Sequence, residues 1–72
     1  MSASNEDQAA VQNAAAYVRD HPGRIQSNTI EHIMGGRSYG WARDRVKRAV
    51  QAGLIIERRR GNRLFLYPPE NA

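Results

Sequence analysis

The first part of the chain carries apolar residues at the spacing of a helix. In this Ala-rich stretch they recur every three or four positions, at Val11, Ala14, Ala15 and Val18. The period predicts an amphipathic helix from about residue 6 to residue 20, because one apolar stripe then faces a core. Residues 1–5 are expected to be a flexible lead, with Ser4 or Asn5 as the helix cap. Glu6 and Asp7 then place negative charge in the first turn, where it suits the helix dipole.

A short extended link, residues 24–26, separates this helix from a second apolar stripe. The stripe consists of Ile30, Ile33 and Met34. Ser27 or Asn28 is expected to cap the second helix, and Asn28 with Glu31 has the spacing of a capping box. Gly35-Gly36 ends the helix after about two turns.

A third helix is predicted from Ser38, its N-cap, to about Ala52, with Gly53 as the left-handed residue that ends it. At about 100° per residue, one face points to the core and consists of Tyr39, Ala42, Val46, Ala49 and Val50. The opposite face consists of Arg37, Trp41, Asp44, Arg48 and Gln51, with Gly40, Arg45 and Lys47 on the flanks. This outer face is basic and carries an exposed tryptophan, which is suited either to cover a neighbouring element or to contact a ligand.

The pattern changes to that of strands after the third helix. Two β-prone runs, residues 54–60 and 63–67, flank Gly61-Asn62, which predicts a hairpin with a two-residue type II′ turn. The register pairs Ile56 with Tyr67, Arg58 with Phe65 and Arg60 with Arg63 on one side of the hairpin. Because like charges that face each other weaken a hairpin, the arginines at its tip indicate contact with phosphates rather than a role in folding.

The positive charge is concentrated in these last two elements. The chain has 72 residues, with 11 Lys and Arg, 7 Asp and Glu, and a formal net charge of +4. Residues 1–36 carry a net charge of −2, residues 37–63 carry +7 and residues 64–72 carry −1. This distribution is typical of a surface that binds a polyanion. A solvated face that is basic for solubility is the alternative.

Size and residue types argue against several classes of function. A sequestered active site is hard to build in so small a core, so we expect no enzyme. The chain has no Cys, and His21 and His32 match no common metal-ligand spacing, so we expect no metal and no cofactor. His21 is expected at the end of the first helix and His32 in solvent. No apolar run is long enough to cross a membrane and no signal-peptide pattern is present, so a soluble, cytoplasmic protein is expected.

The order of elements resembles that of the winged helix-turn-helix family, mainly α with a small β-hairpin. The residues that carry the resemblance are Ser27–Met34 as the second helix, Gly35-Gly36-Arg37 as the turn, Ser38–Ala52 as the recognition helix and Gly53-Leu54-Ile55 as the corner before the wing. It covers residues 6–67, which form the expected DNA-binding domain, and residues 68–72 are expected to be a short tail. The match is a pattern of elements and identifies no subfamily.

The resemblance implies binding of double-stranded DNA, with the third helix in the major groove and the wing on the backbone or minor groove. The helix positions suited to DNA contact are Arg37, Ser38, Tyr39, Gly40, Trp41, Arg43, Asp44, Lys47 and Arg48. The wing positions are Arg58, Arg59, Arg60, Asn62 and Arg63. Asp44 is suited to read a cytosine, but an ion pair with Arg48 four residues later is the favoured use of its carboxylate.

A small transcriptional or replication and recombination regulator, associated with the nucleoid through its DNA binding, is the expected role. We expect a monomer, with cooperative or dimeric binding on DNA as the alternative. Two other hypotheses remain: a DNA-docking domain of a larger replication or translocase protein, and a protein-interaction module that uses Trp41. RNA binding is disfavoured because no platform of exposed aromatic residues is evident.

Overall fold

Three helices and a three-stranded sheet form the structure. The computed structural model describes residues 2–71, and the side chains of residues 7–70. The helices are α1 (Ser2–Asp20), α2 (Gln26–Met34) and α3 (Tyr39–Gln51). The strands are β1 (Arg24–Ile25), β2 (Ile56–Arg60) and β3 (Arg63–Tyr67), followed by the short helix η1 (Pro69–Asn71). The sheet is antiparallel with the order β1-β3-β2, so the predicted mainly helical fold with a small hairpin is confirmed and gains one strand.

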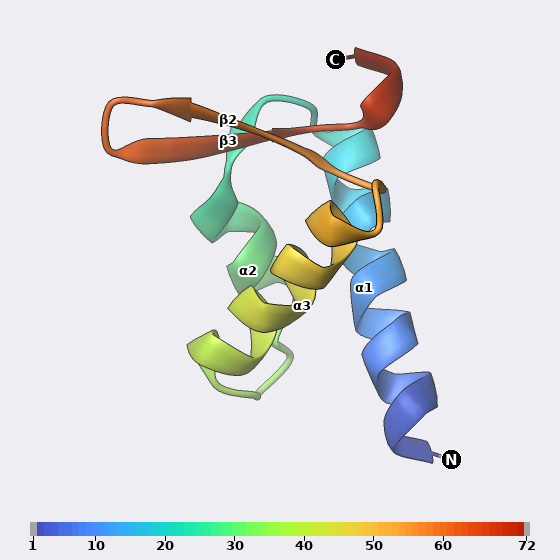
Figure 1. The fold of residues 1–72 in the computed structure, drawn as a ribbon. Helices are drawn as coiled ribbons and strands as arrows, with labels where there is room; N and C mark the ends of the chain where they lie inside the picture. Colours follow the sequence, from blue (N-terminus) through green and yellow to red (C-terminus); the bar gives the residue numbers. More distant parts are fainter. Residues whose placement is uncertain (1, 72) are drawn as a thin grey trace.

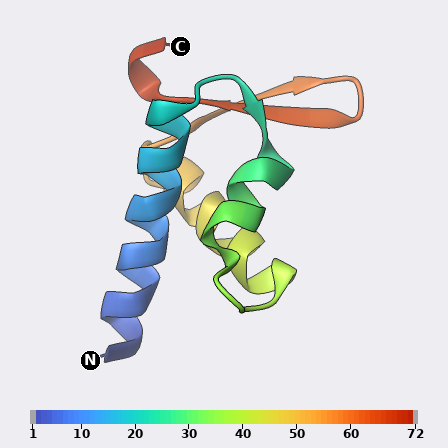
Figure 2. The same ribbon diagram turned by 180° about the vertical axis from the view of Figure 1, so that it is seen from behind.

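The helices lie on one side of the sheet, and the hairpin of β2 and β3 projects beyond them (Figures 1 and 2). Each helix contributes its apolar stripe to a core between the helices and the sheet. The largest fully buried apolar side chains of this core are Val18, Ile30, Val46, Ile55 and Leu66. Because Leu66 of β3 is buried under the helices, side-chain alternation along the strand leaves Phe65 and Tyr67 on the opposite face.

Two features near the N-terminal half differ from the prediction. α1 begins at Ser2, so the lead predicted for residues 1–5 is helical from that residue and the cap predicted at Ser4 or Asn5 is wrong. The link predicted at residues 24–26 contains strand β1, in which Ile25 pairs with Phe65. A strand of two residues has no detectable period in a sequence, and it forms because the edge of β3 is available to pair with it.

α2 begins without a side-chain cap. Its N-cap residue is Ile25, so the caps predicted at Ser27 or Asn28, and the capping box of Asn28 with Glu31, are wrong. The chain leaves β1 and enters the helix directly, which places these polar residues inside the first turns. The predicted end of the helix is confirmed, since Gly35 follows Met34 in the left-handed conformation.

Both predicted ends of α3 are confirmed. The Ser38 hydroxyl accepts a hydrogen bond from the Trp41 amide at 3.0 Å. At the other end, the Gly53 amide donates to the Val50 carbonyl at 3.0 Å and the Leu54 amide donates to the Ala49 carbonyl at 2.9 Å. This pair of bonds is a Schellman motif, and Gly53 adopts the positive φ of 79° that it requires. The motif turns the chain from α3 into the hairpin.

The hairpin has the predicted register. β2 and β3 pair Ile56 with Tyr67, Arg58 with Phe65 and Arg60 with Arg63. Gly61 has a φ of 60°, while none of the described non-glycine residues, including Asn62, has a positive φ. This combination fits the predicted type II′ turn, which needs a positive φ only at its first central residue.

Candidate functional site

The outward surface of α3 is the centre of the candidate site. Its inward face is fixed by Ala42, Val46 and Ala49, which are buried. Arg43 and Lys47 are exposed, and neither forms an ion pair with any residue that the structure describes. Neither charge is held in an ion pair, so both side chains are available to a ligand. Gly40 also lies in open space, where an added Cβ would meet no atom within 4 Å.

On the other flank of α3, two arginines are bound to a carboxylate of α1. The Arg45 guanidinium donates to Asp7 Oδ1 with Nη2 at 2.6 Å and with Nε at 3.2 Å. Arg48 Nη1 lies 3.3 Å from Asp7 Oδ2. Asp44 completes the network, at 3.0 Å from Arg45 and 3.1 Å from Arg48. The predicted pair of Asp44 with Arg48 is confirmed as part of this larger cluster.

Arg45 is the most enclosed member of the cluster. Its side chain is only 13% exposed, whereas that of Arg48 is 48% exposed. Besides the two carboxylates, Arg45 donates to the Trp41 carbonyl at 3.4 Å and lies 4.7 Å from the centre of the Trp41 ring. Such a guanidinium stabilises the contact between α1 and α3, and it is not presented to solvent.

The position of Trp41 corrects the prediction of an exposed tryptophan. The ring is half-buried and packs against the core. The Arg37 guanidinium lies 4.6 Å from the ring centre, so Trp41 carries cation–π contacts from Arg37 and Arg45.

Tyr39, in contrast, is placed on the core face by the helical period but is 44% exposed. It is the first residue of α3, and residues 35–40 are all exposed because the helix begins beyond the packed core.

Asp7 has an altered pKa in this cluster. The hydrogen bond from Arg45 is the main cause, and the charges of Arg45 and Arg48 act in the same direction, so the pKa of Asp7 lies below its ordinary value of 3.8. Partial burial opposes this shift but does not cancel it. Asp7 is therefore ionised over the whole physiological range and permanently neutralises part of the charge of α3.

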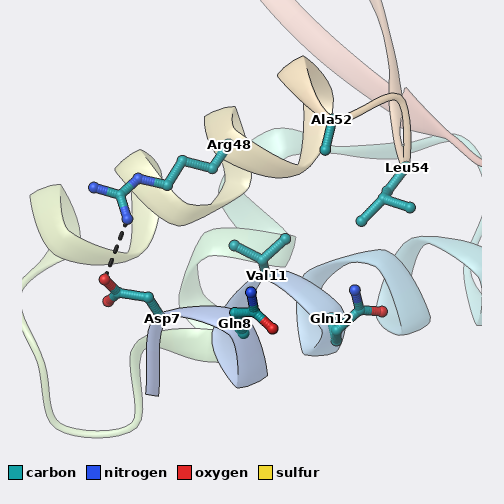
Figure 3. A pocket seen from close by; sticks show the side chains of 7 residues that line it. All are labelled: Asp7, Gln8, Val11, Gln12, Arg48, Ala52 and Leu54. Carbon is teal, nitrogen blue, oxygen red and sulfur yellow. Dashed lines mark hydrogen bonds and ion pairs between the residues drawn. The ribbon is translucent and has the colours of Figure 1, made fainter. Parts of the chain in front are cut away.

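A groove lies beside this cluster, between α1 and the C-terminal half of α3 (Figure 3). Its volume is about 310 Å³, and Val11, Ala52 and Leu54 supply its apolar surface. Asp7 and Arg48 close one end, and their ion pair is drawn as the dashed line in Figure 3. The groove is a consequence of how α1 meets α3, and its polar lining includes Gln8 and Gln12.

The hairpin carries the second concentration of positive charge. Arg58, Arg59, Arg60 and Arg63 are exposed, and none of them forms an ion pair within the described part of the chain. The pleat divides them between two faces. Arg59 lies on the same face as the buried Leu66, toward the helices, whereas Arg58 and Arg60 lie on the opposite face.

The helix-side face of the hairpin continues the outward surface of α3. Lys47, Val50 and Gln51 of α3 line a small hollow of about 110 Å³ together with Glu57 of β2. Arg59 is two residues beyond Glu57 on the same face. A ligand that contacts Lys47 therefore lies beside the helix-side face of β2.

Most of the predicted site residues are exposed in the structure. On α3 and the turn before it these are Arg37, Ser38, Tyr39, Gly40, Arg43, Asp44, Lys47 and Arg48, and on the hairpin Arg58, Arg59, Arg60, Asn62 and Arg63. Trp41 is the exception. The interpretation of Asp7 as a charge in the first helical turn is wrong, because α1 begins at Ser2 and its first turn holds no acidic residue. Asp7 instead pairs with Arg45, which was placed on a flank and was not expected to contact it. The pair joins residues 38 positions apart, for which a single sequence offers no local signal.

The two histidines flank one aromatic ring. His21 follows α1 directly, and its ring centre lies 4.7 Å from that of Tyr17. His32 is exposed, as predicted, and stacks on Tyr17 with ring centres 4.4 Å apart. Over the described residues there is no group of three or more His, Cys, Asp or Glu side chains that could hold a metal ion.

The chain was also compared with known proteins. No model of a known protein family, no curated protein and no solved structure matched it. Within residues 2–71, no helix is both long enough and apolar enough to span a membrane.

Proposed function

We propose that this chain is a winged helix-turn-helix protein that binds double-stranded DNA. In this proposal α3 enters the major groove, which is about 12 Å wide and admits one helix, and the hairpin is the wing that contacts the flanking backbone or minor groove. The observation that carries the proposal is that Arg43 and Lys47 of α3 and Arg59 of β2 are exposed and form no ion pair with a described residue, on a surface where α3 and β2 meet at the hollow lined by Lys47 and Glu57.

The residues of α3 differ in what they offer to DNA. Arg43 and Lys47 have exposed cationic groups that suit phosphates or the acceptor edge of guanine. Ser38 uses its oxygen as the helix cap, and its hydroxyl proton and the N-terminus of α3 suit a phosphate. Arg48 is expected to contribute less than Lys47, because Asp7 and Asp44 already neutralise its charge.

The proposed cellular role is that of a small transcriptional or replication and recombination regulator. A DNA-docking domain of a larger replication or translocase protein would present the same surface. Protein interaction through Trp41 has no support from the geometry, because the ring is half-buried beneath two arginines.

Selection of bound duplexes from a random-sequence library at low salt tests this proposal, followed by affinity measurements at several salt concentrations. Lys47→Ala is expected to weaken duplex binding several-fold and to lower the salt slope by about 1, since one phosphate contact is lost. Arg19→Ala is the matched control, because it removes one exposed positive charge from α1. Equal losses in both variants, or no bound duplex for the wild type, would overturn the proposal.

A further inference from the structure

One face of the sheet is not covered by the helices. The helices α1, α2 and α3 lie on the other side in both views, while the short helix η1 extends beyond the end of β3 on this side (Figures 1 and 2). Side chains alternate along strands, and Leu66 marks the covered face. The uncovered face is therefore formed by Ile25, Ile56, Arg58, Arg60, Arg63, Phe65 and Tyr67.

Positive charge on this face is not balanced by any acidic residue of the strands. Arg58, Arg60 and Arg63 are exposed at the outer half of the hairpin. The acidic residue of β2, Glu57, lies on the covered face and accepts a hydrogen bond from Gln26 at 3.5 Å. The partner with complementary charge for this face is therefore an anion.

Two aromatic rings lie beside these arginines. Phe65 and Tyr67 are both half-buried and occupy alternate positions of β3, so their Cα atoms are about 7 Å apart. The Arg58 guanidinium lies 5.9 Å from the centre of the Tyr67 ring. Tyr67 is held beside Gly23, where an added Cβ would lie 3.4 Å from Tyr67 Cε2. The face thus combines two half-buried aromatic rings with exposed cationic groups, an aromatic surface that the sequence alone did not indicate.

We propose that this uncovered face of the sheet binds single-stranded nucleic acid. Unpaired bases stack on Phe65 and Tyr67, while Arg58, Arg60 and Arg63 neutralise the phosphates between them. Stacking on aromatic side chains beside a cationic track is the general mode by which proteins bind single strands without strong sequence preference. The site lies on the face of the hairpin that points away from α3, so it shares the arginines of the wing with the proposed duplex surface but not Lys47 or Arg43.

An acidic peptide is the competing occupant. Peptides are usually anchored by side chains that enter a pocket, and both hollows described above lie off this face. Bases need only a flat ring to stack on, and Arg58 pairs with Phe65 across the strands and lies 5.9 Å from the centre of the Tyr67 ring, so a ring and a guanidinium lie side by side on this face. These features favour a nucleic acid strand.

Fluorescence anisotropy with a labelled single-stranded dT oligonucleotide tests the proposal, with a labelled poly-Glu peptide as a second probe. Phe65→Leu keeps apolar volume but removes the ring, and it is expected to weaken oligonucleotide binding about fivefold or more. Arg58→Gln is expected to weaken it several-fold. Arg59→Gln removes the same charge from the neighbouring position on the other face, and it is expected to have a clearly smaller effect.

Measuring duplex affinity for the same variants distinguishes the single-strand site from the proposed duplex surface. Lys47→Ala is expected to weaken duplex binding and spare the oligonucleotide, whereas Phe65→Leu is expected to do the reverse. Circular dichroism shows whether each variant is folded, and the exposed Arg58 and Arg59 variants decide the question if Phe65→Leu unfolds. Equal losses for Arg58→Gln and Arg59→Gln, or an intact affinity in folded Phe65→Leu, would overturn the single-strand site. So would tighter, Phe65-dependent binding of poly-Glu.

Discussion

Two of the three arginines of α3 and the four arginines of the hairpin have opposite surroundings. On α3, Arg45 and Arg48 are bound to Asp7 and to Asp44. The four arginines of the hairpin have no carboxylate partner among the described residues. Two segments of similar composition therefore use the same side chain differently. Arg45 and Arg48 join α3 to α1, whereas the arginines of the hairpin remain available to a ligand.

The difference shows why the net charge counted from a segment's sequence is not the charge that the folded segment presents to a ligand. The positive segment of the chain loses part of its field to Asp7, which comes from the segment with net negative charge. On α3 the available cations are consequently Arg43 and Lys47, on the flank away from α1. The hairpin keeps its whole charge, because no helix packs on the tip to supply a carboxylate.

The largest effect is expected from removing the charge of the hairpin. The triple variant Arg58→Gln, Arg59→Gln and Arg60→Gln should weaken duplex binding about 100-fold at low salt and lower the salt slope by up to about 2.7. The reason is that three cations without carboxylate partners are lost together. Duplex affinity measured between low and moderate salt checks this expectation.

Stability provides the control for the triple variant. Because Arg60 faces Arg63 across the strands, the substitutions relieve a repulsion and should not lower the urea midpoint. A variant that unfolds more readily, or that keeps the salt slope of the wild type, contradicts the view that these arginines serve a ligand.

The second expectation concerns stability and compares two arginines of one helix. Arg45→Ala should lower the free energy of unfolding by about 1–3 kcal/mol, because it removes hydrogen bonds to Asp7 and packing on Trp41. Arg43→Ala, which removes an exposed side chain without an ion-pair partner, should change it by less than about 0.5 kcal/mol. Urea denaturation followed by circular dichroism measures both. Similar losses in the two variants would mean that the cluster with Asp7 does not stabilise the fold.

Much of the fold follows from local signals in the sequence. The helices, the ends of α3 and the register of the hairpin depend on residues close to one another, such as Ser38, Gly53 and Gly61. What escaped prediction depends on contacts between distant segments. β1 exists only because β3 is beside it, and the absence of a side-chain cap on α2 follows from that strand.

The candidate site was predictable to a similar extent. Most of its exposed residues could be predicted from the periods of the helix and the strands, because the period fixes which side of the element each side chain points to. The burial of Trp41 and the pairing of Arg45 could not be predicted in this way, since both depend on where α1 crosses α3. A helical wheel gives the angle of a side chain but not the position of the neighbouring helix.

The smallest expected effect is that of Asp7→Asn on stability. It tests the comparison directly, because Asp7 pairs with arginines of α3 and with none of the hairpin. Asp7→Asn should lower the urea midpoint at pH 7 by less than Arg45→Ala does, because an amide still accepts hydrogen bonds but lacks the charge. The folded pKa of Asp7 lies below its ordinary value of 3.8, so its contribution is complete above that pH and is lost as the pH falls through the folded pKa. The urea midpoints of wild type and variant should therefore converge in acid.

The same substitution is expected to act on binding in the opposite direction. With the charge of Asp7 removed, Arg48 is less compensated, so duplex affinity should rise and the salt slope should increase by up to about 0.9. Asp20→Asn changes the charge by the same amount on the same helix, at an exposed position without an ion pair in the described residues. If Asp20→Asn raises affinity equally, only net charge is involved. A gain in duplex affinity confined to Asp7→Asn, together with a loss of stability, shows that the Asp7 carboxylate stabilises the fold by binding arginines of α3 and thereby makes them less available to DNA.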